Sequence, residues 1–303
     1  MLFFALMIGL GMATPILQPQ ISSGERYSES YTLSADLSDG SFLLFQILFF
    51  NFGFGDGNAA CRILYVSKEG QGINRKEKYS NTEWVYTSAT DRLEVGPCVV
   101  QQSSRVQISA TVDDIDMKIT MGTRLQKVRF PGERDVPGRI FQSSVLLNGA
   151  ELSGKLNGRS ISGRAYMDHN RSDAIIKDVG SLWVRYRGMY GTEPMLFQVY
   201  TDASGVSHAW HWHAAQAGPA TLSMSNTVEM NRISPEGIHV RVQDIDIHSQ
   251  RTVFVYNPIE EIGVFGKIAE NLVGNPSTIT YDAKATKNDQ VLSEGVLEVT
   301  FFE

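Results

Sequence analysis

The amino-acid sequence predicts an all-β protein, on the basis of three observations. Apolar and polar residues alternate with a period of two along most of the chain, and the period of an amphipathic helix is nearly absent. Asp39-Gly40 and Asn157-Gly158 each separate two strand-like runs, and these residue pairs favour tight hairpin turns. Short apolar runs recur at regular spacing between Gly, Asn and Asp residues, which is typical of an antiparallel barrel or sandwich.

The predicted strands of the first half share this alternation and lie at residues 31–37, 41–50, 61–66, 106–112, 117–121, 125–130 and 140–145, with another starting at residue 160. The second half repeats the pattern at residues 182–187, 195–201, 206–213, 238–242, 252–256, 277–285 and 291–302. In the last strand, Leu297, Val299 and Phe301 share one face, while Glu298 and Thr300 share the other. One short helix is predicted at residues 267–273, where Gly274 would cap it.

The length and composition of the chain suggest two domains. The chain has 303 residues, of which 42% are hydrophobic and 20% charged, so two full cores are feasible. The tetrapeptide LFQI at residues 44–47 is nearly repeated as LFQV at residues 196–199, which favours duplication of one β-fold. We therefore expect barrels at residues 21–175 and 176–303, after a signal-like apolar N-terminus at residues 1–20.

The N-terminal run MLFFALMIGLGMA, residues 1–13, is apolar, uncharged and ends in small residues. Its length suits the apolar region of a secretory signal and is too short to span a bilayer. This run predicts export to the periplasm or the extracellular space. It is also compatible with a position close to a membrane. The only two cysteines, Cys61 and Cys98, could pair there, and two buried thiols are the alternative.

Several functional classes are excluded or disfavoured by composition and motifs. The formal net charge is −6 and the basic residues are scattered, so nucleic acid is excluded as a principal partner. The chain has no G-x-S-x-G nucleophile elbow and no phosphate-binding loop followed by Lys-Ser or Lys-Thr. No cofactor is expected.

The densest polar cluster is GRAYMDHNRS at residues 163–172, which contains Tyr166, Asp168 and His169. This run resembles the Y-x-D-H signature of the family that includes carotenoid 1,2-hydratases, AttH-like proteins and survival-factor proteins. It is most similar to the survival-factor branch, where Arg-Ser and then a W-[VI]-R-[FY]-R segment follow, as in WVRYR at residues 183–187 here. The run SDGSFLLFQ at residues 38–46 also resembles the first hairpin of that branch, so the resemblance extends over about residues 28–200.

The resemblance implies two lipocalin-like antiparallel β-barrels in tandem, with an apolar cavity within or between them. Members of such families bind lipids, hydrate polyene chains or catalyse pericyclic reactions. In the hydratase branch, the positions that match Tyr166 and Asp168 are implicated in protonating a double bond, and we add His169 as a candidate catalytic residue. The His-x-Trp pair of that branch is missing here, and Arg171-Ser172 replaces its Trp-Gly, so both departures argue against hydratase activity.

The chemistry of Asp168 has two interpretations. A carboxyl group that faces an apolar cavity has a raised pKa and could protonate an alkene, with Tyr166 orienting it from the same strand face. Alternatively, Asp168 is ionised and paired with Arg164, Arg171 or Arg185, and the pair holds the two barrels together.

The run HAWHWH at residues 208–213 could form an aromatic cavity wall or part of a metal site. On a strand, Trp210 and Trp212 point to one face and His211 and His213 to the other. Two such histidines would need a third zinc ligand, for example His239, His248 or Asp244. We expect no metal, because no second pair has convincing spacing.

The leading functional hypothesis is binding of an apolar, lipid-like small molecule. The expected ligand contacts are aromatic residues and one arginine, namely Trp183, Arg185, Trp210, Trp212, Phe45 and Phe197. The alternative is a cofactor-free hydratase, isomerase or cyclase of an apolar polyene or isoprenoid, with Asp168 as the general acid. A third hypothesis is an interaction module whose barrels are filled by side chains. The sequence does not predict the oligomeric state.

Overall fold

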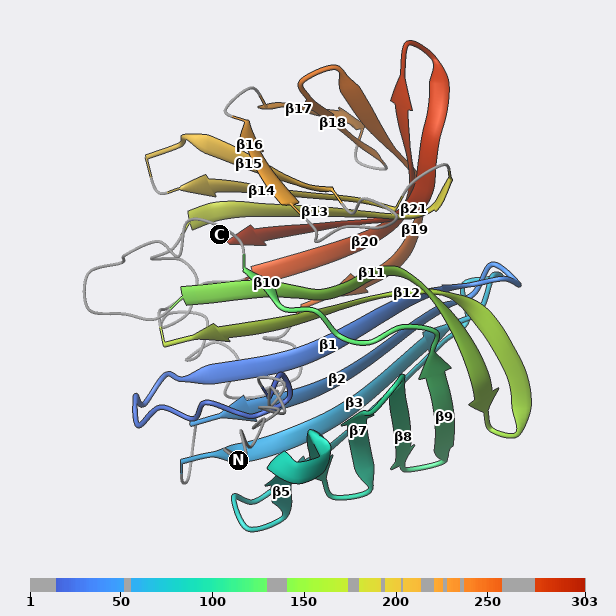
Figure 1. Ribbon diagram of the computed structural model, residues 1–303. Helices are drawn as coiled ribbons and strands as arrows, with labels where there is room; N and C mark the ends of the chain where they lie inside the picture. Colours follow the sequence, from blue (N-terminus) through green and yellow to red (C-terminus); the bar gives the residue numbers. More distant parts are fainter. Residues whose placement is uncertain are drawn as a thin grey trace, which may run out of the picture.

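The computed structural model describes residues 15–51, 56–129, 141–173, 180–191, 194–202, 204–213, 221–225, 228–234, 237–257 and 276–302. These residues form two antiparallel sheets, each curled into a nearly closed barrel, one after the other along the chain (Figure 1). The described part contains one short 3-10 turn, Ser88–Thr90, and no α-helix, so the all-β prediction is confirmed. It also contains no helix that is long and apolar enough to cross a membrane. The predicted signal at residues 1–13 and the predicted helix at residues 267–273 lie outside the described residues.

The first sheet has strands from the first half of the chain. They are β1 (Ser28–Leu37), β2 (Phe42–Phe50), β3 (Asn58–Val66), β4 (Gly72–Tyr79), β5 (Trp84–Thr87), β6 (Arg92–Val95), β7 (Cys98–Gln102), β8 (Val106–Val112), β9 (Ile115–Met121), β10 (Val128–Arg129), β11 (Phe141–Leu156) and β12 (Arg159–Ser172). Their order across the sheet is β4-β3-β2-β1-β12-β11-β9-β8-β7-β6-β5, and β10 pairs with β11.

The second sheet has strands from the second half. They are β13 (Gly180–Gly191), β14 (Met195–Asp202), β15 (Ser207–His213), β16 (Thr221–Ser225), β17 (Val228–Ser234), β18 (Gly237–Val242), β19 (Ile245–Tyr256), β20 (Pro276–Lys287) and β21 (Gln290–Phe302). Their order is β16-β15-β14-β13-β21-β20-β19-β18-β17.

The two sheets share one arrangement of strands. In each sheet the first strand pairs with the last, β1 with β12 and β13 with β21, and the next three strands follow on the other side of the first. The repeated tetrapeptide lies on β2 in one sheet and on β14 in the other, which are equivalent positions. This correspondence supports duplication of one β-fold.

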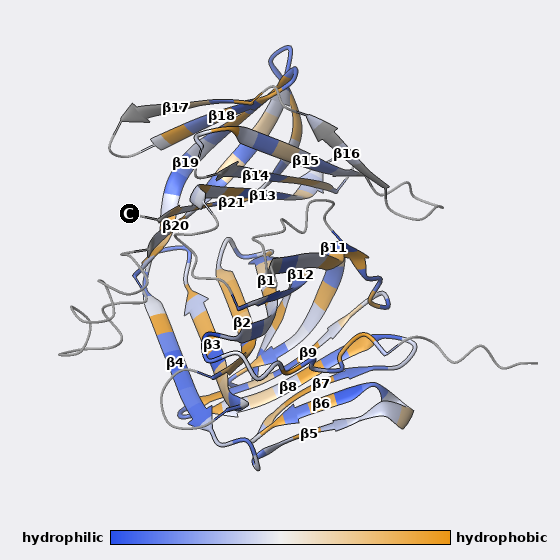
Figure 2. Cartoon of the chain, turned by 90° about the vertical axis from the view of Figure 1, so that its left-hand side faces the viewer, coloured by the Kyte–Doolittle hydropathy of each residue, from blue (hydrophilic) through white to orange (hydrophobic). Residues whose placement is uncertain are grey.

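Alternating burial explains why these segments form strands with one face in a core. On β8, Val106, Ile108 and Val112 are buried while Gln107 and Thr111 are exposed. Ribbons of both sheets accordingly change between hydrophobic and hydrophilic colours along their length (Figure 2). Half-burial of a period-two pattern thus determines which side of each strand faces inward.

The turns match the predicted hairpins. Asn157 and Gly158 join β11 to β12 and have φ angles of 48° and 77°, the positive values that a two-residue turn of this kind requires. Gly40, with φ of 81°, closes the hairpin between β1 and β2. At these positions, Asn and Gly are favoured because they tolerate the left-handed region.

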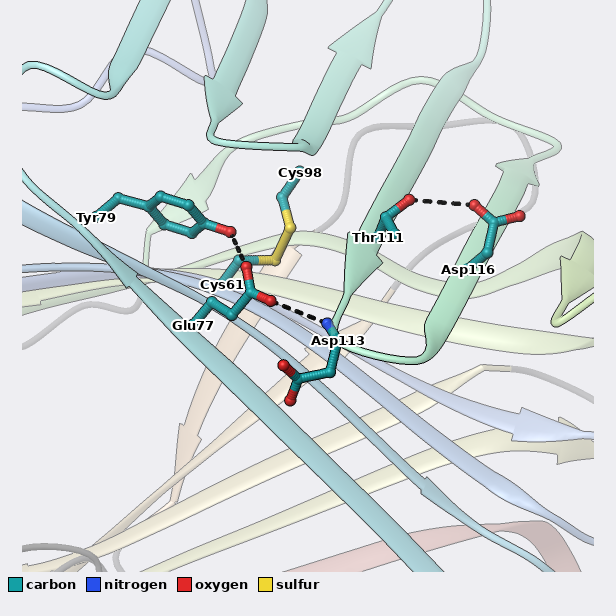
Figure 3. Close-up of a disulfide and its surroundings, with 7 residues drawn as sticks. All are labelled: Cys61, Glu77, Tyr79, Cys98, Thr111, Asp113 and Asp116. Atoms are coloured by element: carbon teal, nitrogen blue, oxygen red, sulfur yellow. Dashed lines mark hydrogen bonds between the residues drawn. A yellow bond between two sulfur atoms is a disulfide. The ribbon is translucent and has the colours of Figure 1, made fainter.

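A disulfide between Cys61 on β3 and Cys98 on β7 links two distant parts of the first sheet (Figure 3). Of the two alternatives left open by the sequence, the structure therefore contains the bridge. Nearby, the Asp113 backbone N–H donates to Glu77 Oε1 at 2.9 Å, from the β8–β9 turn to β4. These contacts hold the far strands against β3 and β4 and so close the first barrel.

Three clusters of buried residues organise the interior. One cluster fills the first barrel and includes Phe45, and a second fills the other barrel and includes Phe197. The third cluster lies between the barrels, where outward-facing residues of both sheets meet, and it includes Tyr166, Trp210 and Trp212. We call this contact region the seam.

Candidate functional site

A cavity of about 310 Å³ lies in the seam, and both sheets contribute its lining. The first sheet supplies residues from β1, β2, β3 and β12, and the second supplies residues from β13, β19, β20 and β21. The lining side chains belong to the outer faces of the barrels rather than to their cores. We call this space the seam cavity.

Asp168 of β12 is fully buried beside the seam cavity. Its Oδ2 accepts a hydrogen bond from Arg185 Nη1 of β13, and its Oδ1 accepts one from Asn170 Nδ2 at 2.8 Å. Of the three arginines considered from the sequence, Arg185 is therefore the one that pairs with Asp168. Burial raises the pKa of Asp168, while the positive charges of Arg185 and Arg187 oppose that effect.

A second buried ion pair joins Arg187 of β13 to Glu298 of β21, with Nη2 and Oε2 3.0 Å apart. Arg187 is only 1% exposed. Burial acts to raise the pKa of Glu298, but Arg187 and Arg185 outweigh it and hold the pKa below its ordinary value. Both arginines thus have an acidic partner beside the cavity, one from each barrel.

The alternation of the WVRYR segment places these groups. Trp183, Arg185 and Arg187 point to the seam cavity, whereas Val184 and Tyr186 belong to the core of the second barrel. One strand therefore contributes both a core face and a charged cavity wall.

Arg62 of β3 is a further buried cation that sequence reasoning missed. It is 7% exposed, its guanidinium carbon lies 4.2 Å from the Tyr256 ring centroid, and its Nε donates to Asn74 Oδ1 at 2.9 Å. Glu298 was assigned from the sequence to the face opposite Leu297 and Val299 but was not singled out. For Arg62 the available signal was a lone charge within an otherwise apolar strand.

Tyr166 lies beneath the two arginines of β13. Its ring centroid is 4.9 Å from the Arg187 guanidinium carbon and 5.9 Å from that of Arg185. Its hydroxyl is buried and interacts with the Asp168 carboxylate, which adds to the raised pKa of Tyr166. Burial raises the pKa of Tyr166 well above its ordinary value, so the phenol stays neutral and packs under the cations.

His169 lies apart from Asp168, because adjacent residues on a strand point to opposite faces. Its Nε2 contacts Glu29 Oε1 at 2.6 Å, and its ring stacks on Tyr31 at a centroid distance of 4.4 Å. Burial lowers the pKa of His169, so the ring is neutral and its Nε2–H donates to the carboxylate. The structure therefore does not bring the three candidate catalytic residues together.

The six candidate ligand contacts fall into three groups. Trp183 and Arg185 line the seam cavity. Trp210 and Trp212 are buried in the seam cluster, beside the cavity rather than in its lining. Phe45 and Phe197 are each buried in the core of one barrel, on the faces opposite to the seam.

The histidines of the second barrel form a different group from the one considered from the sequence. His239, Asp246 and His248 place their ligand atoms within 4.8 Å of one another on the outer face of β18 and β19. His239 Nε2 contacts Asp246 Oδ1 at 2.7 Å, and Arg241 Nε lies 3.9 Å from the same oxygen. The neighbouring arginine already balances the carboxylate and repels a cation, so this group is explained as an ion-pair cluster.

A second hollow, of about 540 Å³, opens on the first barrel near Tyr190. Its charged residues Arg105 and Glu151 are exposed to solvent and Arg164 is half-buried, and its lining contains no buried ion pair. The seam cavity is therefore the better candidate for a site.

Comparison with known proteins places the fold. No family model and no curated protein matches this sequence. Among solved structures, an AttH candidate from Nitrosomonas europaea matches with a TM-score of 0.65 and 14% identity, over 92% of this chain and 93% of the other. Kievitone hydratase from Nectria haematococca matches with a TM-score of 0.54 and 9% identity, over 97% and 94%. CghA with Sch210972 matches with a TM-score of 0.57 and 8% identity, over 92% and 89%.

The fold and the site together define a tandem lipocalin-like barrel protein with a charged cavity at its seam. This chain has the fold that the AttH candidate and the hydratase share. Assignment to the survival-factor branch stays a prediction.

Proposed function

We propose that this protein binds a lipid-like small molecule in the seam cavity. The observation that carries the proposal is the buried Asp168–Arg185 pair at the wall of a cavity that both barrels line. A buried ion pair is costly to desolvate and contributes little net stability. Titratable groups with perturbed pKa values cluster at functional sites. Aromatic side chains such as Trp183, Phe254 and Phe42 supply apolar surface beside the charges, as in a small-molecule pocket.

The similar structures support a small-molecule function for this fold. One of them, CghA, was solved with the compound Sch210972, and another is named a hydratase. A cavity between two barrels is suited to such ligands, because docking the second barrel excludes water from one side of the ligand.

A catalytic role for Asp168 is the second candidate, as a general acid in a cofactor-free hydratase, isomerase or cyclase. It is favoured by the burial of this carboxyl beside the cavity, which raises its pKa. Binding ranks first because both carboxyl oxygens accept N–H hydrogen bonds, from Arg185 and Asn170, which is the arrangement of an ionised group.

An exported setting is part of the proposal. The disulfide between Cys61 and Cys98 supports an oxidising compartment, such as the periplasm or the extracellular space. Mass measurement of the mature chain from its own host would test this, and a cytoplasmic chain that retains residues 1–13 would contradict it.

Binding can be tested with Nile red, an apolar fluorophore, and by native mass spectrometry of protein purified from its own host. We expect a lipid-sized mass on the protein, and competition between Nile red and lipids for the cavity. Thr300→Phe, which places a ring in the cavity lining, should weaken Nile red binding. Thr111→Phe is the matched control on the exposed face of β8, and it should bind as wild type does. Wild-type affinity for Nile red in the Thr300→Phe variant, or no Nile red binding by the wild-type protein, would overturn the proposal.

A further inference from the structure

The lining of the seam cavity is richer in polar groups than a purely hydrocarbon ligand requires. Three arginines, two carboxylates, Asn170, Gln46 and several hydroxyl groups contribute to the lining, beside a larger apolar surface. A ligand that consists only of hydrocarbon would strip water from these groups and give no hydrogen bonds in return. The lining therefore selects for a molecule with polar atoms at one end.

The unused hydrogen-bonding capacity of the cavity is in N–H donors. Arg187 uses Nη2 for Glu298, which leaves Nε and Nη1 without a partner in the described part of the chain. Among the same described residues, Arg185 uses Nη1 for Asp168 and its Nε has no hydrogen-bond partner. Arg62 uses Nε for Asn74, and no described residue accepts a hydrogen bond from its Nη2. Guanidinium groups cannot accept hydrogen bonds, so only a ligand with acceptor atoms, such as carboxylate oxygens, can satisfy these sites.

These arginines are true cavity groups and not surface residues. Arg62 and Arg185 are each 7% exposed, and Arg187 is 1% exposed. The positions of Arg185 and Arg187, two residues apart on one strand face, put their guanidinium groups on the same wall. A planar oxyanion is the group whose geometry matches guanidinium N–H donors.

The charge balance of the lining indicates the charge of the ligand. Arg62, Arg185 and Arg187 carry three positive charges, and Asp168 and Glu298 carry two negative charges, which leaves a surplus of one. A ligand with a single negative charge would neutralise the cavity. A monoanionic head therefore fits better than a neutral head or a dianion such as a phosphate monoester.

We propose that the seam cavity recognises an amphiphile with a carboxylate head, held by the free N–H groups of Arg185 and Arg187 with Arg62 on the opposing sheet. The inference rests on the proposed binding function and specifies its ligand class. The tail would lie against the apolar part of the lining, formed by Phe42, Leu44, Leu64, Trp183 and Phe254.

The test compares decanoate with decan-1-ol, which differ only in the head group, by calorimetric titration of the full chain. We expect decanoate to bind roughly ten- to a hundred-fold more tightly, the size typical of hydrogen bonds to a charged group. Equal affinity for the two compounds would overturn the head-group inference and leave the proposed binding function intact. Binding of neither compound would overturn both.

Arg62→Met is the variant that removes a cation without leaving a buried carboxylate unpaired, because Arg62 bonds to Asn74 rather than to an acid. It should reduce the preference for decanoate over decan-1-ol severalfold. Arg75→Met, an identical change at a half-buried arginine of neighbouring β4 outside the cavity lining, is the matched control and should keep the full preference. A preference that survives in Arg62→Met and also in the paired variant Arg187→Met/Glu298→Met would refute the arginine assignment.

Discussion

Replacement of Asp168 by Asn tests whether the buried carboxylate is part of the structural frame. Asp168 is fully buried and accepts hydrogen bonds from Arg185 and Asn170. Asn preserves the shape of the side chain but has no charge. Its amide nitrogen replaces one carboxyl oxygen, so an N–H donor then faces the donor of Arg185 or of Asn170. Arg185, itself nearly buried, then loses its ionised partner on the first barrel.

The expected loss of unfolding free energy is about 3–5 kcal/mol, the usual cost of breaking a buried ion pair from one side. That is a large share of a typical domain stability of about 5–15 kcal/mol. Affinity for the neutral probe Nile red should fall only in proportion to the unfolded fraction, because the cavity keeps its shape.

Urea unfolding followed by tryptophan emission is a suitable assay, since Trp183, Trp210 and Trp212 lie at the seam. Asp114→Asn, in the exposed pair with Arg75, is the matched control and should leave the unfolding midpoint unchanged.

The double variant Asp168→Asn/Arg185→Met should recover part of the lost stability, because it also removes the unpaired cation. An Asp168→Asn protein with wild-type midpoint and wild-type ligand affinity would refute this reasoning. Wild-type stability combined with a loss of turnover of about 10²–10⁴-fold would instead establish Asp168 as a general acid.

Three further changes have defined outcomes. Cys61→Ala/Cys98→Ala opens a 37-residue loop and should cost about 4 kcal/mol by loop entropy, measured as a shift in urea midpoint; an unchanged midpoint would contradict this. Burial, aided by Asp282, raises the pKa of Asp36 to about 7 from an ordinary 3.8, so the folded state loses stability as pH rises between these values. The free energy of unfolding of Asp36→Asn, relative to that of wild type, should therefore rise by at most about 4 kcal/mol between pH 4 and pH 8. A difference in melting temperature that does not change with pH would argue against a raised pKa of Asp36. A Cβ at Gly295 would lie 1.9 Å from the Arg187 carbonyl oxygen, so Gly295→Ala should lower the free energy of unfolding by about 1–3 kcal/mol. This loss should appear as a lower melting temperature, and an unchanged melting temperature would show that the strands can separate there.

Strands with a buried face were predictable, whereas a strand without any buried residue was not. The run at residues 106–112 was predicted from alternation alone, and β8 has these bounds. By contrast, β4 has the sequence GINRKEKY and no buried residue, so it has no period-two hydrophobic signal. Its strand conformation depends on backbone hydrogen bonds to β3, which sequence periodicity does not reveal.

Local periodicity also explains which part of the site was visible in the sequence. Alternation alone assigns Trp183, Arg185 and Arg187 to one strand face, and likewise Tyr166 and Asp168, because the backbone turns successive side chains to opposite sides. It equally assigns His169 to the face opposite Asp168, where the structure places it beside Glu29.

The partners across the seam were decided only by the tertiary structure. From the sequence, Asp168 could pair with Arg164, Arg171 or Arg185, and two of these lie on its own strand. The structure selects Arg185 because the outer faces of two separate sheets dock there, and it adds Arg62 from a third strand. Strand periodicity is a property of a few neighbouring residues, whereas the docking of two barrels depends on shape and charge over whole faces, which no single segment of sequence encodes.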